Sequence, residues 1–353
     1  MHSKKFFACI LSAILLASSS VSISASTNIE AYQTLTLDEA VTRAINYSDT
    51  ISTYNRQQEY QGLQVDQAKL SYNSYSGAYI YEAALFSRDQ VTKLSLLERE
   101  IIEYEMTQLF DDILMTQKEY QYQIKVIDQT EKEIRKLEIM TEQGFGNLLQ
   151  EESLKLQLQT EKMQLSSLED SLSSMFLTLT STINSIDDYY ILEKEPNEYK
   201  PYSYTGSADS LGRLKANDSI FVWAAQEGVD IAELTPLASS FDWYERKDKE
   251  ETIAQAKDQV SSTKDQVASL VEDLYWQMRQ LETAYDTTKL NVELAEKQIR
   301  MNEIYFNQGM MSQFDYDSSV LSYEKALIEL EKIVNQHTYL CKTINKPDLL
   351  LGS

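Results

Sequence analysis

The stretch Leu154–Leu179, which reads LKLQLQTEKMQLSSLEDSLSSMFLTL, carries the pattern that decides the fold. Its mostly apolar residues recur at alternating steps of four and three, so they return every seven residues along one face of a helix, which we call the seam. These positions are Leu154, Leu158, Glu161, Leu165, Leu168, Leu172, Met175 and Leu179. A seven-residue period predicts long helices that pack side by side with a left-handed supercoil.

The same pattern occurs a second time, in the C-terminal half of the chain. We call the shift that lays Gly144 on Gly309 the repeat offset; it also lays Tyr120 on Tyr285. At the repeat offset the seam face becomes Ser319, Tyr323, Ala326, Leu330, Ile333, His337, Leu340 and Ile344. The sequence therefore predicts an internal duplication of one helical unit.

Turn-forming residues are scarce, with only 9 Gly and 4 Pro in 353 residues. None lies between Gly77 and Gly144 or between Pro236 and Gly309, which leaves room for helices of roughly 80–100 Å. We expect an all-α fold of long antiparallel coiled-coil helices in two tandem repeats. The predicted repeats cover 26–192 and 213–353, with a linker at 193–212. Strand signals are weak, and the tyrosine-rich segment Ser71–Tyr81 is interpreted as a turn or an irregular helix junction.

The N-terminus has the order of a secretory signal peptide. Lys4 and Lys5 precede an apolar run from Phe6 to Ala17, and small residues follow up to Ala25. We therefore predict a signal peptide at 1–25 and an exported protein; the alternative is an N-terminal anchor that is retained.

Composition excludes several classes of function. The 32 basic and 55 acidic residues give a net charge of -23, which argues against nucleic acid as a partner. Only two Cys and two His occur, so neither a metal site nor a cofactor is expected.

Two further motifs resemble the TolC family of efflux ducts. The stretch Leu35–Asn46, LTLDEAVTRAIN, is similar to the leucine-x-leucine-x-x-alanine opening helix of that family, with an aspartate N-cap position at Asp38. Phe306-Asn307-Gln308-Gly309, with Asp315 six residues beyond the glycine, resembles the family's helix-turn-helix tip. The resemblance implies a homotrimer that forms a hollow helical barrel. Its tips would dock on a periplasmic-adaptor-type (membrane fusion) protein, which serves an inner-membrane ABC or proton-driven transporter.

The resemblance also implies roles for individual residues. The partner-docking tips would comprise Gln143, Gly144, Gly146, Phe306, Gln308, Gly309 and Met310. Asp315, Asp317, Glu151 and Glu152 would supply the carboxylates of the aperture, which would favour cations electrostatically. In the alternative interpretation, the glycines are ordinary hairpin turns and the acids mark solvated helix starts.

The chain departs from the family pattern in two respects. Thr141 and Gln150 stand where the first repeat would carry the aromatic residue and the aspartate of the tip. The segments Leu70–Leu94 and Leu234–Ile253, where a typical member inserts membrane strands, are too short and too charged to face lipid. We therefore expect a reduced member, a TolC-like α-barrel without the β-barrel.

Two other functions remain open at the level of sequence. The first is a structural or adhesive coiled-coil surface protein that has no lumen. The second is an exported enzyme, which the sequence disfavours. His337 and Cys341 are four residues apart on one helical face, but His337 occupies the seam position of Leu172. We expect a packed histidine rather than a catalytic one, and hence no enzyme.

Overall fold

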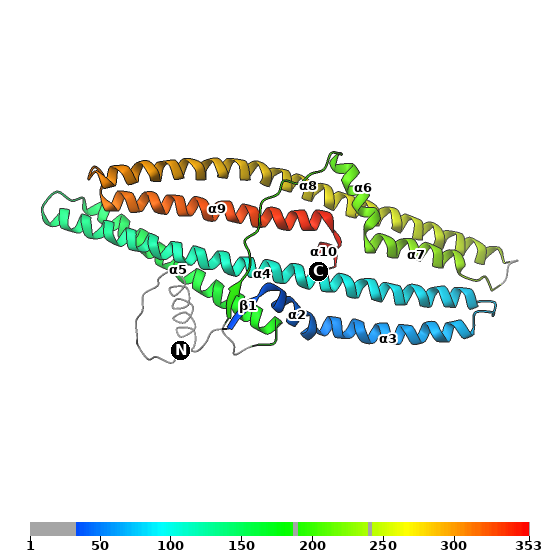
Figure 1. Ribbon diagram of the computed structural model, residues 1–353. Helices are drawn as coiled ribbons and strands as arrows, with labels where there is room; N and C mark the ends of the chain where they lie inside the picture. The colour runs from blue at the N-terminus through cyan, green and yellow to red at the C-terminus, as the bar shows by residue number, and fades with distance from the viewer. Residues whose placement is uncertain (1–32, 186–189, 239–241, 353) are drawn as a thin grey trace. The chain divides into compact units, whose positions relative to one another are not determined.

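The computed structural model describes residues 33–185, 190–238 and 242–352 (Figure 1). The predicted signal peptide at 1–25 lies outside the described residues. The elements in chain order are β1 (Gln33–Thr36), α2 (Leu37–Tyr47), α3 (Asp49–Leu70), α4 (Gly77–Glu142), α5 (Leu148–Thr182), β2 (Tyr190–Glu193), α6 (Ala208–Asp218), α7 (Ile220–Leu234), α8 (Trp243–Asn307), α9 (Gln313–Asn345) and α10 (Asp348–Leu351). Long helices dominate, which confirms the predicted all-α class.

Three pairs of helices, with one member of each pair in each half of the chain, match in length. α4 and α8 have 66 and 65 residues, and α5 and α9 have 35 and 33. The short helices α2 and α6 have 11 residues each. Every position of the two seven-residue faces is buried or half-buried. The two repeats are therefore visible as elements, while the residue boundaries of the repeats stay a prediction.

Three local features differ from the sequence prediction. β1 and β2 form a two-stranded parallel sheet, with Gln33 opposite Tyr190 and Thr36 opposite Glu193, and the sequence analysis missed both strands. α2 begins at Leu37, where the Thr36 hydroxyl accepts the Glu39 N–H at 3.3 Å, so the N-cap is not Asp38. α6 begins at Ala208, inside the predicted linker at 193–212.

The chain forms two compact units, and each unit collects segments from both repeats. Unit 1 comprises the described part of Met1–Ala40 together with Met106–Glu198 and Thr283–Asn335. Its core contains Leu35 of β1, Phe110 of α4 and Leu179 of α5, all of which are fully buried. In the same unit, Lys194 forms an ion pair with Asp111, and the Asn197 amide donates to Asp111 Oδ2 at 2.8 Å.

Unit 2 comprises Val41–Glu105, Tyr199–Glu282 and Gln336–Ser353. One of its buried clusters consists of Leu211, Val271, Leu274, Met278 and Ile344. α10 adds Leu349 to Leu97 and Ile101 of α4. Its Asp348 accepts the Ser219 hydroxyl at 2.5 Å and the Ile220 N–H at 2.9 Å, so the side-chain carboxylate of Asp348 caps the start of α7.

His337 lies in unit 2 and is 2% exposed. Its Nε2 atom is 3.6 Å from Glu282 Oε1, and its ring centroid is 4.9 Å from that of Tyr199. The Cys341 thiol is 3.7 Å from the imidazole, and burial followed by the charge of Glu282 raises the pKa of that thiol to about 11. The thiol is therefore protonated at neutral pH, which is the reverse of what nucleophilic chemistry requires.

Candidate docking surface at the helix turns

The turns after α4 and α8 share one backbone conformation. Gly144 and Gly309 have φ values of 79° and 72°, a left-handed region that glycine adopts without steric cost. The Phe145 N–H donates to the Met140 carbonyl at 2.9 Å, and the Met310 N–H donates to the Tyr305 carbonyl at 2.9 Å. Each helix therefore ends in a Schellman motif, at matching positions of the two repeats.

Both turns present large apolar side chains to solvent. The exposed set comprises Ile139, Met140, Phe145, Leu148 and Leu149 at the first turn, and Met301, Ile304, Tyr305 and Met310 at the second. Phe145 is 80% exposed and Met310 is 72% exposed. Figure 1 shows the two turns at the same end of unit 1. Exposed apolar patches are common at sites where proteins bind partners, so we treat the two turns as the candidate docking surface.

The predicted tip residues divide into exposed and structural ones. Gln143 and Gln308 are exposed, as are both turn glycines. The ring of Phe306 instead stacks on Tyr316 at a centroid distance of 5.2 Å, so it braces the second turn. A Cβ atom on Gly146 would lie 2.0 Å from the Thr141 hydroxyl, which explains why a glycine fits there.

The sequence analysis missed Phe145 and Leu148 as docking candidates. The available signal was the run Gln143–Gln150, which contains no charged residue in a chain of which 25% is charged. The residues of a turn lie outside the helix faces that pack against a neighbour. Apolar side chains in such a run therefore face solvent.

The predicted aperture carboxylates of α9 start that helix. The Ser312 hydroxyl donates to Asp315 Oδ2 at 2.7 Å and accepts the Asp315 N–H at 3.2 Å. Asp317 accepts the Gln313 amide at 2.6 Å and lies 3.8 Å from Lys132 of α4. These contacts fit the alternative interpretation of a helix start, and the aperture role stays a prediction.

The carboxylates of α5 also lie beside α4. Lys155 bridges Glu151, at 2.6 Å, and Glu138 of α4, at 2.9 Å. The hydrogen bond from Lys155 lowers the pKa of Glu151, and the bonds to both carboxylates raise the pKa of Lys155. Glu152 is exposed on the next position of the helix. The structure thus places one predicted carboxylate pair on each helix that flanks the end of α4.

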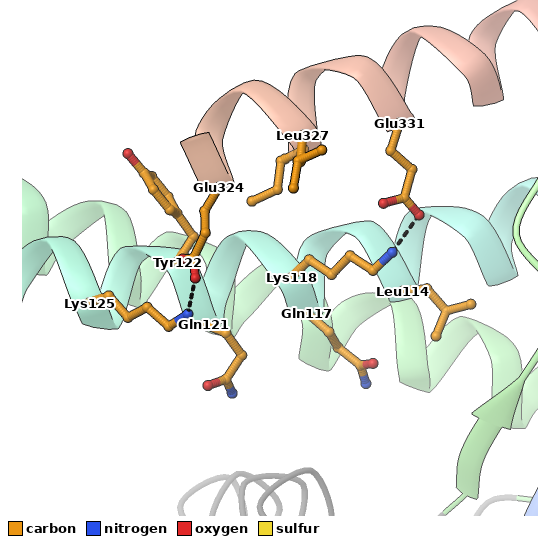
Figure 2. Close-up of a pocket in the computed structure, with 10 residues that line it drawn as sticks. Leu114, Gln117, Lys118, Gln121, Tyr122, Lys125, Glu324, Leu327 and Glu331 are labelled. Atoms are coloured by element: carbon orange, nitrogen blue, oxygen red, sulfur yellow. Dashed lines mark hydrogen bonds and ion pairs between the residues drawn. The ribbon is translucent and has the colours of Figure 1, made fainter. Parts of the chain in front are cut away.

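A ladder of ion pairs joins α4 to α9, and the sequence analysis did not predict it. Lys118, Lys125 and Lys132 pair with Glu331, Glu324 and Asp317, respectively, so each step moves seven residues forward along α4 and seven back along α9. Figure 2 shows the first two pairs across a groove of about 440 Å³, with Leu327 of α9 beside them. Burial and the nearby Glu324 raise the pKa of Tyr122 in this groove. The ladder fixes an antiparallel register between the two helices.

None of the helices in the described part of the chain combines the length and apolar character needed to cross a bilayer. Within the same residues, no three or more His, Cys, Asp or Glu side chains are grouped to hold a metal ion.

Comparison with solved structures identifies the fold. No protein-family model matches the sequence, and no curated protein matches it. The fold is that of outer membrane channel proteins, as the resemblance to the TolC family implied. The outer membrane protein VceC from Vibrio cholerae aligns with a TM-score of 0.60 at 12% identity, over 88% of this chain and 96% of that chain.

Two further channels support the same assignment. The CmeC outer membrane channel of Campylobacter jejuni aligns with a TM-score of 0.55 at 10% identity, over 90% of this chain and 85% of that one. The MtrE outer membrane channel of Neisseria gonorrhoeae, in its open state, aligns with a TM-score of 0.52 at 11% identity, over 95% and 96% of the two chains. At these identities the likeness establishes the fold.

Proposed function

We propose that this chain is a TolC-like duct component of an export or efflux system in the cell envelope. Three copies form a hollow helical conduit, and the turns at Gly144 and Gly309 dock on an adaptor protein. The adaptor connects the conduit to an inner-membrane ABC or proton-driven transporter, which supplies the energy. The chain itself is a passive conduit and performs no catalysis.

The observation that carries the proposal is the pair of matched turns. Both end in a Schellman motif, and both expose apolar side chains at the same end of unit 1. A single hairpin turn needs a glycine but has no need of exposed Phe145 or Met310. Methionine and aromatic residues are enriched at protein interfaces, which favours a protein as the ligand.

The four predicted carboxylates fit a passive role beside the docking surface. Asp315, Asp317, Glu151 and Glu152 stand within the first turns of α9 and α5, next to the docking turns. Because Lys155 and Lys132 pair with Glu151 and Asp317, the negative charge that three copies place at the entrance would come mainly from Asp315, and it would favour cationic cargo.

Photo-crosslinking and imaging test the proposal together. A photoreactive residue at Phe145 or Met310 should link the chain in intact cells to a protein with a coiled-coil hairpin. The matched control probe is Leu63 of α3, which is 64% exposed and belongs to unit 2. The double variant F145E/M310E should lose the partner, because charge is introduced where apolar contact is expected, while L63E should keep it.

Averaged electron micrographs of the purified protein separate the duct from its rival. A hollow particle of three copies supports the conduit. A thin solid rod would instead establish the structural or adhesive surface protein, and partner capture that survives F145E/M310E would overturn docking through the turns.

A further inference from the structure

Within the described residues of unit 1, α4 packs against two helices, on two different faces. One face meets α5, where Glu131 pairs with Lys162 at 2.8 Å and Glu138 with Lys155 at 2.9 Å. The other face meets α9 through the ion-pair ladder. Near the turn, Lys136 of α4 also lies 5.7 Å from the ring centroid of Phe314 on α9. The ladder face of α4 is thus distinct from its hairpin face.

Because of the duplication, the ladder faces of α4 and α9 have counterparts on α8 and α5, respectively. The repeat offset takes the ladder face of α4 to Leu290, Leu294, Lys297 and Met301 on α8. The same offset takes the ladder face of α9 back to Leu149, Glu152, Leu156 and Met163 on α5. The helices α5 and α8 therefore carry the counterparts of a joint that α4 and α9 make within one chain.

These counterpart faces are apolar and exposed. Leu149, Leu156 and Met163 recur every seven residues on α5 and are 75%, 67% and 58% exposed. On α8, Leu290, Leu294 and Met301 are 65%, 63% and 54% exposed. Leu156 stands two residues before the seam residue Leu158, about 200° around the helix, so the exposed face points away from the hairpin seam.

We propose that α5 of one copy packs antiparallel against α8 of the next copy, in the register that α4 and α9 adopt within a chain. The contact of Lys132 with Asp317 then becomes a contact of Lys297 with Glu152 of the neighbouring copy. The contact of Lys136 with Phe314 becomes one of Met301 with Leu149. This names the contact between copies on which the proposed duct rests, and so deepens that function.

Complementarity favours a second copy of this chain over any other occupant. In this register Leu156 faces Leu294 and Leu149 faces Met301, so exposed apolar residues of the two faces cover each other at two successive positions. The charged residues of the two counterpart faces also lie opposite each other, and Glu152 and Lys297 have opposite charges. Each copy has one counterpart face on α5 and one on α8, so the contact between copies is head-to-tail. Once such contacts close into a ring, every counterpart face is covered.

Cross-linking between single-cysteine variants tests the register. In a background with Cys9 and Cys341 replaced by Ser, L156C and L294C are produced separately, mixed, and treated with an oxidant or a short bismaleimide. We expect a covalent heterodimer, which only a contact between copies can give. The matched control mixes M163C with M301C, whose thiols lie about 20 Å apart in the proposed register and should stay unlinked. Linking in the control mixture, or none in the first, overturns the proposal.

A charge swap gives an independent readout in case the cysteine variants assemble poorly. E152K and K297E should each weaken self-association about tenfold in sedimentation, since each places like charges opposite each other. The double variant E152K/K297E should regain wild-type association, and K69E on α3 should leave it unchanged. Single variants without effect, or a double variant that is weaker than both, count against the contact.

The outcomes for the contact and for the duct are separable. Cross-links in the proposed register together with solid rods in micrographs would leave the contact standing and remove the duct. Hollow particles that cross-link only through other residue pairs would leave the duct standing and remove this contact.

Discussion

Replacing Lys194 by Met should destabilise unit 1 far more than the loss of an ordinary surface lysine. The side chains of Lys194 and Asp111 are 9% and 7% exposed, so the ion pair between them is almost fully removed from water. Without Lys194, the Asp111 carboxylate is left in a site with little solvent to compensate its charge. Removing one partner of such a pair typically costs about 3–5 kcal/mol.

The neighbouring amide sets where in that range the value falls. Asn197 still donates to Asp111 Oδ2 at 2.8 Å in the variant, and a hydrogen bond to a charged group retains part of the stabilisation. We therefore expect K194M to lower the free energy of unfolding by about 3 kcal/mol, the low end of that range. The double variant D111N/K194M removes both charges of this buried pair and should lie within about 1 kcal/mol of wild type.

Urea unfolding followed by circular dichroism at 222 nm measures these differences. K125M is the matched control, because Lys125 also forms an ion pair in unit 1, at 2.6 Å, but its side chain is 54% exposed. Its loss should cost less than about 1 kcal/mol. The reasoning is refuted if K194M is no less stable than K125M, or if D111N/K194M is as unstable as K194M alone.

Asp348→Ala should destabilise unit 2 by about 2–4 kcal/mol, seen as a lower thermal midpoint, because the buried Ser219 hydroxyl and the α7 N-terminus lose their acceptor. Gly309→Ala should lower the free energy of unfolding by about 1 kcal/mol, because Gly309 has a φ of 72°. Gly228→Ala, at a helical position with open space around it, should instead raise the free energy of unfolding by roughly 0.5–1 kcal/mol. Equal thermal midpoints for the two variants would contradict the backbone argument. The pKa of Cys341 is raised to about 11, chiefly by burial, so the unfolded chain loses the thiol proton first as pH rises. Cys341 should therefore contribute about 1 kcal/mol to the fall in the free energy of unfolding between pH 9 and 11, after discounting for the half-exposed thiol. Tyr122, whose pKa is also raised, contributes to the same fall, so Cys341→Ser should make the fall smaller by about 1 kcal/mol in urea titrations at the two pH values.

The long helices and their seams could be predicted because their signals are local and repeated. A seven-residue period sustained over Leu154–Leu179 specifies a helix whatever it packs against, and its recurrence at the repeat offset specifies a second one. The breaks at Gly144 and Gly309 are local as well, because a positive φ is a property of the residue itself.

The two strands could not be predicted, because their cause is not local. β1 and β2 have four residues each, and the helices α2 to α5 lie between them in sequence, so neither strand is stabilised until the other is in place. Pairing with Ile191 and Leu192 draws Thr34 and Leu35 into the sheet, and the opening helix starts only at Leu37.

The candidate docking surface was predictable in position but not in composition. The resemblance placed it at the turns, and the structure shows which side chains there face solvent. Phe306 was expected to be available to a partner, yet it stacks on Tyr316, whereas Phe145 is 80% exposed. Which phenylalanine is exposed depends on the path of the chain after each turn, and the matched glycines do not determine that path.

The two kinds of helix joint differ in a way that bears on the order of assembly. Within the chain, the ladder between α4 and α9 uses three lysine–carboxylate pairs, whose charges remain hydrated whenever the joint is open. At the proposed contact between copies, the counterpart of the Lys125–Glu324 pair is Leu290 with Gln159, and the flanking residues are Leu and Met. Exposing such an apolar face to water is unfavourable, so association with another copy stabilises a single copy. The net charge of -23 opposes unspecific aggregation through the exposed counterpart faces. Because like-charged copies repel less when salt screens them, ring assembly should strengthen as salt is added, while a contact made mainly of ion pairs would weaken.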